Sequence, residues 1–151
     1  MEIEILRNTS AESDTAYMLT RELMAHHNAL DIFTTTKERL SELIDSGMLM
    51  SFTLYLNGNP AGIMNFFFKL TTFTGRKILY IEDLYVREEY RGNGLGKAFL
   101  SKAKEIARET DCEQIELKCA SWNKASAEFY KAQKMKTENE WISFTLDKSL
   151  F

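Results

Sequence analysis

The sequence predicts an α/β protein in which helices cover a mixed β-sheet. Apolar residues alternate with polar ones in several short segments, as in strands that bury one face, and recur every three or four residues in others, as in amphipathic helices. In the C-terminal half, a helical pattern lies between two strand-like segments, which is typical of a crossover between parallel strands. The sheet is therefore expected to be mixed and to be covered by helices.

The N-terminal third predicts one strand and two helices. Residues 3–6 alternate charge and apolarity and suit a first strand. Residues 11–27 carry apolar side chains at helical spacing. Thr35 and Glu38 match a capping box that opens a second helix, and Gly47 is expected to end it.

The middle of the chain predicts three strands. Residues 51–56 alternate well, residues 57–60 (Asn-Gly-Asn-Pro) have the chemistry of a turn, and residues 61–70 read as the partner strand of a hairpin. A loop at residues 71–76 follows. Residues 78–86 (ILYIEDLYV) are rich in β-forming residues and predict a long central strand.

The last third predicts helix, strand, helix and strand. Residues 95–106 have one apolar helical face. Residues 114–119 suit a short strand, residues 122–131 suit a helix with Asn123 near its start, and residues 141–146 suit a final strand.

Composition sets the broad class of the protein. The 151 residues predict one domain, residues 1–151, and the 44% hydrophobic and 27% charged residues are ordinary for a soluble globular protein. The net charge of -3 argues against nucleic-acid binding. No apolar run reaches the about 20 residues that a membrane span needs. The acidic N-terminus and the two isolated cysteines predict a cytoplasmic protein with free thiols.

The densest cluster of glycines lies between the long central strand and the following helix, in the stretch Arg-Gly-Asn-Gly-Leu-Gly at residues 91–96. The first turn of a helix presents unpaired N–H groups, and glycines allow an anion to approach them. The combination predicts a phosphate-binding site. The spacing fits neither the Rossmann fingerprint nor the P-loop, and a tight turn alone would explain one or two of the three glycines.

This stretch resembles the acetyl-CoA pyrophosphate loop of the GCN5-related N-acetyltransferases (GNAT family). The segments YIEDLYV, YRGNGLG and WNKASAEFYK look most like the diamine (spermidine/spermine-type) acetyltransferases. The resemblance implies the GNAT fold: a mixed, mostly antiparallel sheet with central splayed parallel strands and helices on both faces. It also implies acetyl-CoA as cosubstrate, bound by Leu84, Tyr85, Val86, Arg91, Gly92, Asn93, Gly94, Leu95, Gly96, Lys97, Asn123, Ser126 and Lys131.

The resemblance further implies direct transfer of acetyl to a primary amine in a ternary complex. Glu82 matches the position of the base, which acts through water, and Tyr130 matches the acid that protonates the CoA thiolate. Simple alternation places Asp83 on the opposite face of the strand from Glu82. Each residue also has a structural reading: Glu82 in a surface salt bridge, Tyr130 in core packing beside Phe129, and Asn123 as a helix cap.

The acceptor is less defined by the sequence. His26, His27 and Thr72 stand where diamine acetyltransferases carry acids, which weakens the case for a polyamine. Substrate-binding candidates are His26, His27, Glu82, Glu116 and Trp141. A small-molecule amine is the expected acceptor, a protein or peptide amine is the alternative, and a CoA-binding module without turnover is a further alternative. The resemblance implies a homodimer, and two histidines without clustered cysteines predict no metal site.

Overall fold

Five strands form one sheet in the order β1-β2-β3-β4-β5 in the computed structural model, which describes residues 1–151. The pairs β1–β2, β2–β3 and β3–β4 are antiparallel, and the pair β4–β5 is parallel. This confirms the predicted mixed sheet. The strands are β1 (Ile3–Arg7), β2 (Met50–Leu56), β3 (Asn59–Leu70), β4 (Lys77–Val86) and β5 (Cys112–Leu117).

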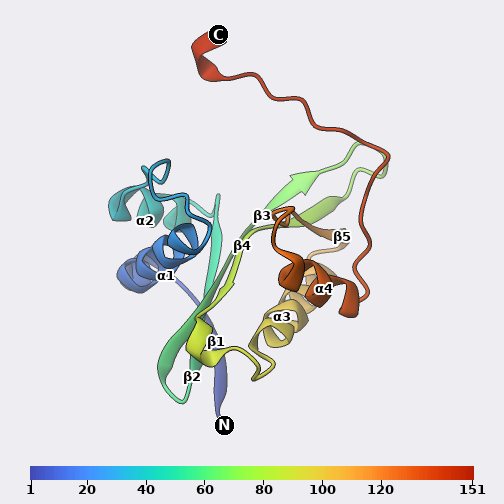
Figure 1. Ribbon diagram of the computed structural model, residues 1–151. Helices are drawn as coiled ribbons and strands as arrows, with labels where there is room; N and C mark the ends of the chain where they lie inside the picture. The colour runs from blue at the N-terminus through green and yellow to red at the C-terminus, as the bar shows by residue number, and fades with distance from the viewer. The chain divides into compact units, whose positions relative to one another are not determined.

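The chain divides into two units, Met1–Lys118 and Cys119–Phe151. The first unit holds the sheet and the helices α1 (Ser13–His26), α2 (Lys37–Asp45) and α3 (Leu95–Glu109). Within it, α1 and α2 lie on one face of the sheet and α3 lies on the other (Figure 1). The second unit holds α4 (Lys124–Ala132). No helix in either unit is long and apolar enough to cross a membrane.

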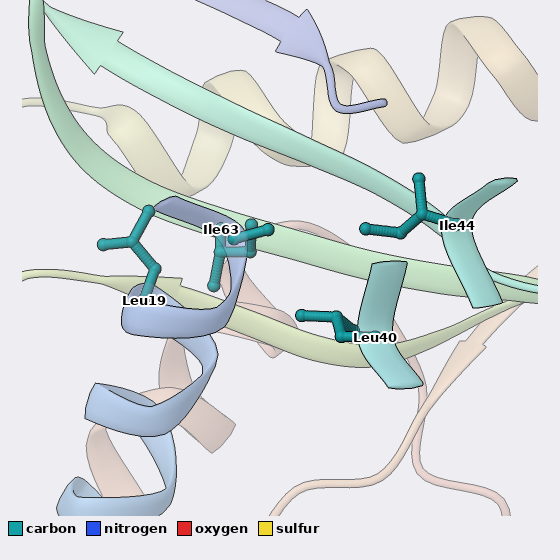
Figure 2. Packing of buried hydrophobic residues seen from close by; sticks show 5 residues of the cluster. Leu19, Leu40, Ile44 and Ile63 are labelled. Atoms are coloured by element: carbon teal, nitrogen blue, oxygen red, sulfur yellow. The ribbon is translucent and has the colours of Figure 1, made fainter. Parts of the chain in front are cut away.

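The core on the α1 side joins both helices to the sheet. Leu19 of α1, Leu40 and Ile44 of α2, and Ile63 of β3 are buried in one cluster with Ala16, and Figure 2 shows Leu40 and Ile44 pointing toward Ile63. On the other face, α3 buries Leu95, Phe99, Leu100 and Ala103. The apolar residues of α3 therefore recur at the spacing that the sequence predicts.

Two local predictions change by a residue or two. The N-cap of α2 is Thr36, whose side chain accepts a hydrogen bond from the backbone N–H of Arg39, so the predicted cap at Thr35 is wrong by one position. The turn after β2 uses only Asn57 and Gly58, both with positive φ, as tight hairpins require. Pro60 therefore belongs to β3, where the register shifts and the sheet can accept a residue without an N–H.

The predicted final strand at residues 141–146 is not formed. These residues have no regular secondary structure, and Ile142, Phe144 and Leu146 are 79%, 89% and 64% exposed. A strand needs a neighbour for its backbone hydrogen bonds. The unit Cys119–Phe151 contains no other strand, so alternation of side chains alone does not produce one here.

Candidate active site

The pairing of β4 with β5 stops halfway along β4. The last pair is Ile81 with Leu117, whereas the pairing of β4 with β3 continues to Val86. The stretch that contains Leu84, Tyr85 and Val86 therefore has a strand neighbour on one side only. The two parallel strands therefore part, as the resemblance to the GNAT family implies, and backbone groups of β4 are left available to an extended ligand.

The glycine loop leads from the end of β4 into α3. Gly92 and Gly94 have φ values of 81° and 75°, a region that disfavours other residues. Gly94 is the N-cap of α3, and no side chain caps the helix. The first helical bond runs from the N–H of Ala98 to the carbonyl of Gly94, so the N–H groups of Leu95, Gly96 and Lys97 have no partner within the helix.

Two side chains brace the loop from within. Arg91 Nε donates to the carbonyl of Val86 at 3.0 Å, and Asn93 Nδ2 donates to the carbonyl of Tyr90 at 3.0 Å. A Cβ added at Gly92 or Gly94 would meet no protein atom within 4 Å, so the fold itself requires these glycines for their positive φ and not to avoid a clash within the protein. The result is a fixed loop that directs uncapped, partly positive amides outward, as an anion site requires.

The acidic pair on β4 lies at a β-bulge. Asp83 pairs with Asn65, while Ile81 pairs with the next residue of β3, Phe66, so Glu82 is the extra residue. Tyr80 pairs with Phe67, which lies two residues from Asn65 and hence on the same face of β3. Tyr80 and Asp83 thus share the face covered by α1. The simple alternation predicted from the sequence does not hold across the bulge, because a bulge places two residues opposite one.

Asp83 is buried in a hydrogen-bonded network, whereas Glu82 is exposed. Asn65 Nδ2 donates to Asp83 Oδ2 at 2.9 Å and to Thr20 Oγ1 at 3.0 Å, and Thr20 in turn donates to the carbonyl of Ala16. Burial raises the pKa of Asp83 to about 6, the bond from Asn65 opposes that rise, and the charge of Glu82 adds to it. Asn65 Oδ1 is buried without a hydrogen-bond partner.

A second acid lies near this pair. Glu116 of β5 is paired in register with Tyr80, and Lys69 Nζ contacts Glu116 Oε1 at 2.9 Å. The same ammonium lies 5.2 Å from the centre of the Tyr80 ring. Burial raises the pKa of Tyr80, with smaller contributions from Glu82 and Glu116. Glu82 and Glu116 therefore both lie close enough to Tyr80 for their charges to act on its hydroxyl.

The two histidines lie at the C-terminal end of α1. The rings of His26 and His27 are 5.7 Å apart, and the ring of His26 lies 6.4 Å from that of Tyr85. Burial lowers the pKa of His27, and the neighbouring His26 adds to this effect. His26 therefore lies beside the same stretch of β4 that is expected to hold the cosubstrate. No group of three or more His, Cys, Asp or Glu side chains is arranged to hold a metal ion.

The remaining candidates belong to the unit Cys119–Phe151. Asn123 caps α4 by accepting a hydrogen bond from the N–H of Ser126 at 3.1 Å, as its structural reading predicts. Tyr130 is half-buried with its ring 5.3 Å from that of Phe129. Burial, with a smaller contribution from Cys119, raises the pKa of Tyr130 to about 12. Lys131 is exposed, and Trp141 is 70% exposed.

Comparison with known proteins shows which family the chain belongs to. A sequence model of the acetyltransferase (GNAT) family matches residues 16–135. The chain belongs to this family. The crystal structure of an aminoglycoside acetyltransferase from an uncultured soil metagenomic sample shares the GNAT fold, with a TM-score of 0.83, 18% identity, and coverage of 96% of this chain and 95% of that one.

Curated relatives of this GNAT chain include two thialysine N-epsilon-acetyltransferases. The protein from Sus scrofa is 38% identical over 85 residues, which are 54% of this chain and 49% of that protein. The protein from Caenorhabditis elegans is 25% identical over 147 residues, which are 95% of this chain and 91% of that protein. The chain therefore spans about half the length of the first relative that it matches.

Sequence reasoning missed the residues of this GNAT chain that contact Asp83 and Tyr80. Asn65 and Lys69 occupy alternate positions of β3 on the face toward α1, and Tyr80 comes two residues before Glu82. The even spacing of Asn65, Phe67 and Lys69 is visible in the sequence and could have placed them on one face. Their meeting with Tyr80 and Asp83 could not be found in this way, because it depends on the bulge.

Proposed function

We propose that this protein is an N-acetyltransferase that moves acetyl from acetyl-CoA to the primary amine of a small molecule, by direct attack in a ternary complex. One observation carries the proposal: the uncapped N-terminus of α3 follows a glycine loop at the end of a strand that has parted from its parallel neighbour. A diphosphate fits the outward amides, and an extended pantetheine arm fits the one-sided stretch of β4.

The residues of the chain suit this cosubstrate. Backbone groups of Leu84, Tyr85 and Val86 would pair with the pantetheine arm, and the loop would hold the diphosphate. Acetyl-CoA supplies an activated acetyl thioester. In the second unit, Asn123, Ser126 and Lys131 are the proposed contacts. The loop residues proposed to hold the diphosphate are Arg91, Gly92, Asn93, Gly94, Leu95, Gly96 and Lys97.

Glu82 is the proposed base. An alkyl amine has a pKa near about 10.4, so that at pH 7 only about one molecule in 10³ is nucleophilic. The carboxylate of Glu82 is exposed at the bulge, immediately before the one-sided stretch of β4, where it can accept the proton of an acceptor directly or through water. Its structural reading as a surface salt bridge is not supported, since no ion pair of Glu82 is present among the salt bridges.

Tyr130 is the proposed acid. With its pKa raised to about 12, its hydroxyl stays protonated throughout the neutral range and can donate a proton to a departing thiolate. We expect Tyr130→Phe to lower kcat at least tenfold with little change in the affinity for acetyl-CoA, because the ring is kept and only the proton is lost. Steady-state assays with calorimetry check this. An unchanged kcat would remove Tyr130 from the acid role.

The proposed acceptor is a small amine such as an amino-acid side chain of the lysine-analogue type. Glu82 and Glu116 provide negative charge for an ammonium group, while Lys69 already offsets the charge of Glu116. A site with this balance suits a shorter or less charged amine than a polyamine. The thialysine acetyltransferases among the relatives support the same class. His26, His27 and Trp141 remain proposed acceptor contacts.

An acetyl-CoA turnover screen tests the proposal. Released thiol is measured with diamines, polyamines, diamino acids and lysine-containing peptides as acceptors. We expect the highest kcat/KM with a diamino acid. Preference for a peptide would favour the protein or peptide alternative. Tight acetyl-CoA binding without turnover of any acceptor would favour a non-catalytic module. A homodimer and a cytoplasmic location remain predictions from the sequence.

A further inference from the structure

One carboxylate of the acidic pair has no part in the proposed function. Asp83 is 8% exposed, and the pairing of β4 with β3 places it directly opposite Asn65, beside the extra residue Glu82. A regular strand would direct two successive side chains to opposite faces. The bulge breaks this alternation at Glu82, so that one carboxyl group is exposed and the next is buried, and the charge of Glu82 acts on Asp83.

The buried partner is held in a fixed position. Asn65 is fully buried and donates both of its amide hydrogens, one to Asp83 and one to Thr20 of α1. Its oxygen Oδ1 has no partner, which is costly for a buried atom. If the amide turns over, that oxygen can accept a hydrogen bond from a neutral Asp83. Asn65 can therefore hydrogen-bond both the ionised and the protonated carboxyl group.

We propose that Asp83 and Glu82 form a carboxylate pair that takes up one proton from the acceptor amine, with Glu82 facing the acceptor and Asp83 acting through Glu82 as a positioning residue. The inference rests on the proposed function. The acceptor ammonium gives up one proton and becomes a neutral amine, and the charge of the pair changes from -2 to -1. The repulsion between two adjacent carboxylates favours this uptake, and the proton later leaves to water.

The charged groups near the carboxylate pair decide whether both of its carboxyl groups stay ionised. Glu116 and Lys69 both lie near Tyr80, and their ion pair offsets their two charges. From α1, Thr20 faces Asn65, whereas Glu22 and His26 face Tyr85 farther along β4. From α2, the apolar Leu40 and Ile44 face the sheet. The pair therefore has no close cation that would hold both carboxylates ionised, and the rise of the Asp83 pKa to about 6 agrees with this.

Asp83→Asn tests the pair because it keeps a hydrogen-bond acceptor for Asn65 and removes only the charge. In the wild-type protein we expect kcat/KM to rise with pH through an ionisation near 6, and in Asp83→Asn we expect this ionisation to be lost and kcat/KM at pH 7 to fall at least fivefold. In the Glu82→Gln background, the same substitution should change kcat/KM less than twofold, because Asp83 acts through Glu82. The matched control Asp111→Asn, on the surface and 85% exposed, should match wild type.

A titration without turnover separates this inference from the proposed function. Carbon-13 NMR of the side-chain carboxyl groups should show one step shared by Glu82 and Asp83 in the wild-type protein, and that step should be missing from the Glu82 signal of Asp83→Asn. An unchanged Glu82 signal, or an equal loss of kcat/KM with and without Glu82, would overturn the pair. If no amine is acetylated, the proposed function fails, but the NMR titration still shows whether Glu82 and Asp83 titrate as a pair. Asp83→Ser replaces Asp83→Asn if the latter does not fold.

Discussion

At the scale of the residue, Gly62 shows how closely α3 and the sheet approach each other. A Cβ at this position would lie 2.5 Å from the Tyr85 carbonyl oxygen and 3.0 Å from the Phe99 ring. We expect Gly62→Ala to lower the free energy of unfolding by about 1–3 kcal/mol, because the strands or the helix must move to make room. Urea denaturation measures this. An unchanged midpoint would show that β3 and β4 can shift at no cost.

The buried Asp83 predicts a particular dependence of stability on pH. Its pKa is raised from 3.8 to about 6 in the folded protein, so the folded state binds the proton more tightly than the unfolded chain. Ionisation of Asp83 therefore destabilises the fold, and the loss grows from about pH 4 to reach about 3 kcal/mol above pH 6. Urea denaturation of wild type and Asp83→Asn should give free energies that diverge over this range, with the variant more stable at pH 7. Parallel curves would contradict the raised pKa.

At the scale of the element, Arg87 ties the end of β4 to α1. Its guanidinium donates to both carboxylate oxygens of Glu22, at 2.9 Å and 2.7 Å, and to the carbonyl of Pro60 at 2.9 Å. We expect Arg87→Ala to cost about 1.5–3 kcal/mol of unfolding free energy, because it leaves a half-buried carboxylate unpaired. Arg39→Ala, which breaks an exposed ion pair with Glu42, should cost less than about 1 kcal/mol. Equal costs measured by thermal or urea denaturation would show that burial of the pair does not matter.

Elements could be predicted where one local signal decided them. The periodicity of α3, the β-forming run of β4 and the Asn-Gly turn after β2 each rest on neighbouring residues. The bulge at Glu82 could not be predicted, since it depends on the register between β3 and β4. The prediction of a final strand at residues 141–146 was wrong for a related reason. Alternation shows that a segment can form a strand, but it does not show which other strand the segment would pair with.

At the scale of the whole molecule, the candidate site also has one part that could be predicted from neighbouring residues and one part that depends on contacts between distant segments. The phosphate-binding loop could be predicted because Arg91, Gly92 and Gly94 are adjacent in the sequence and their chemistry is local. The contacts of Asp83 and Tyr80 come from three strands and a helix, and sequence alone did not predict that Asn65, Lys69 and Thr20 take part in them. The prediction of one domain over residues 1–151 stays a prediction.

The exposed apolar side chains of the second unit bear on assembly. Ile142, Phe144 and Leu146 occupy every second position of one segment, and all three are mostly exposed. A group of large apolar side chains that is exposed in this way is unusual in a monomer. We expect a homodimer that buries them. Light scattering after size exclusion should give a dimer for wild type, a monomer for Phe144→Asp, and a dimer for the control Leu70→Asp at another exposed apolar position. A monomeric wild type would contradict this expectation.

Because β4 and β5 part, the sheet contains a stretch of inner strand that lacks one of its two neighbours. Outer strands exchange their amide hydrogens with water readily, whereas strands with two neighbours are protected. The stretch from Leu84 to Val86 belongs to β4, which lies between β3 and β5 in the sheet. The stretch nevertheless pairs with β3 alone, as an edge strand would. A pantetheine arm lying there would complete the ladder, so that the reagent consumed in each turnover would also serve, while bound, as part of the scaffold that surrounds it.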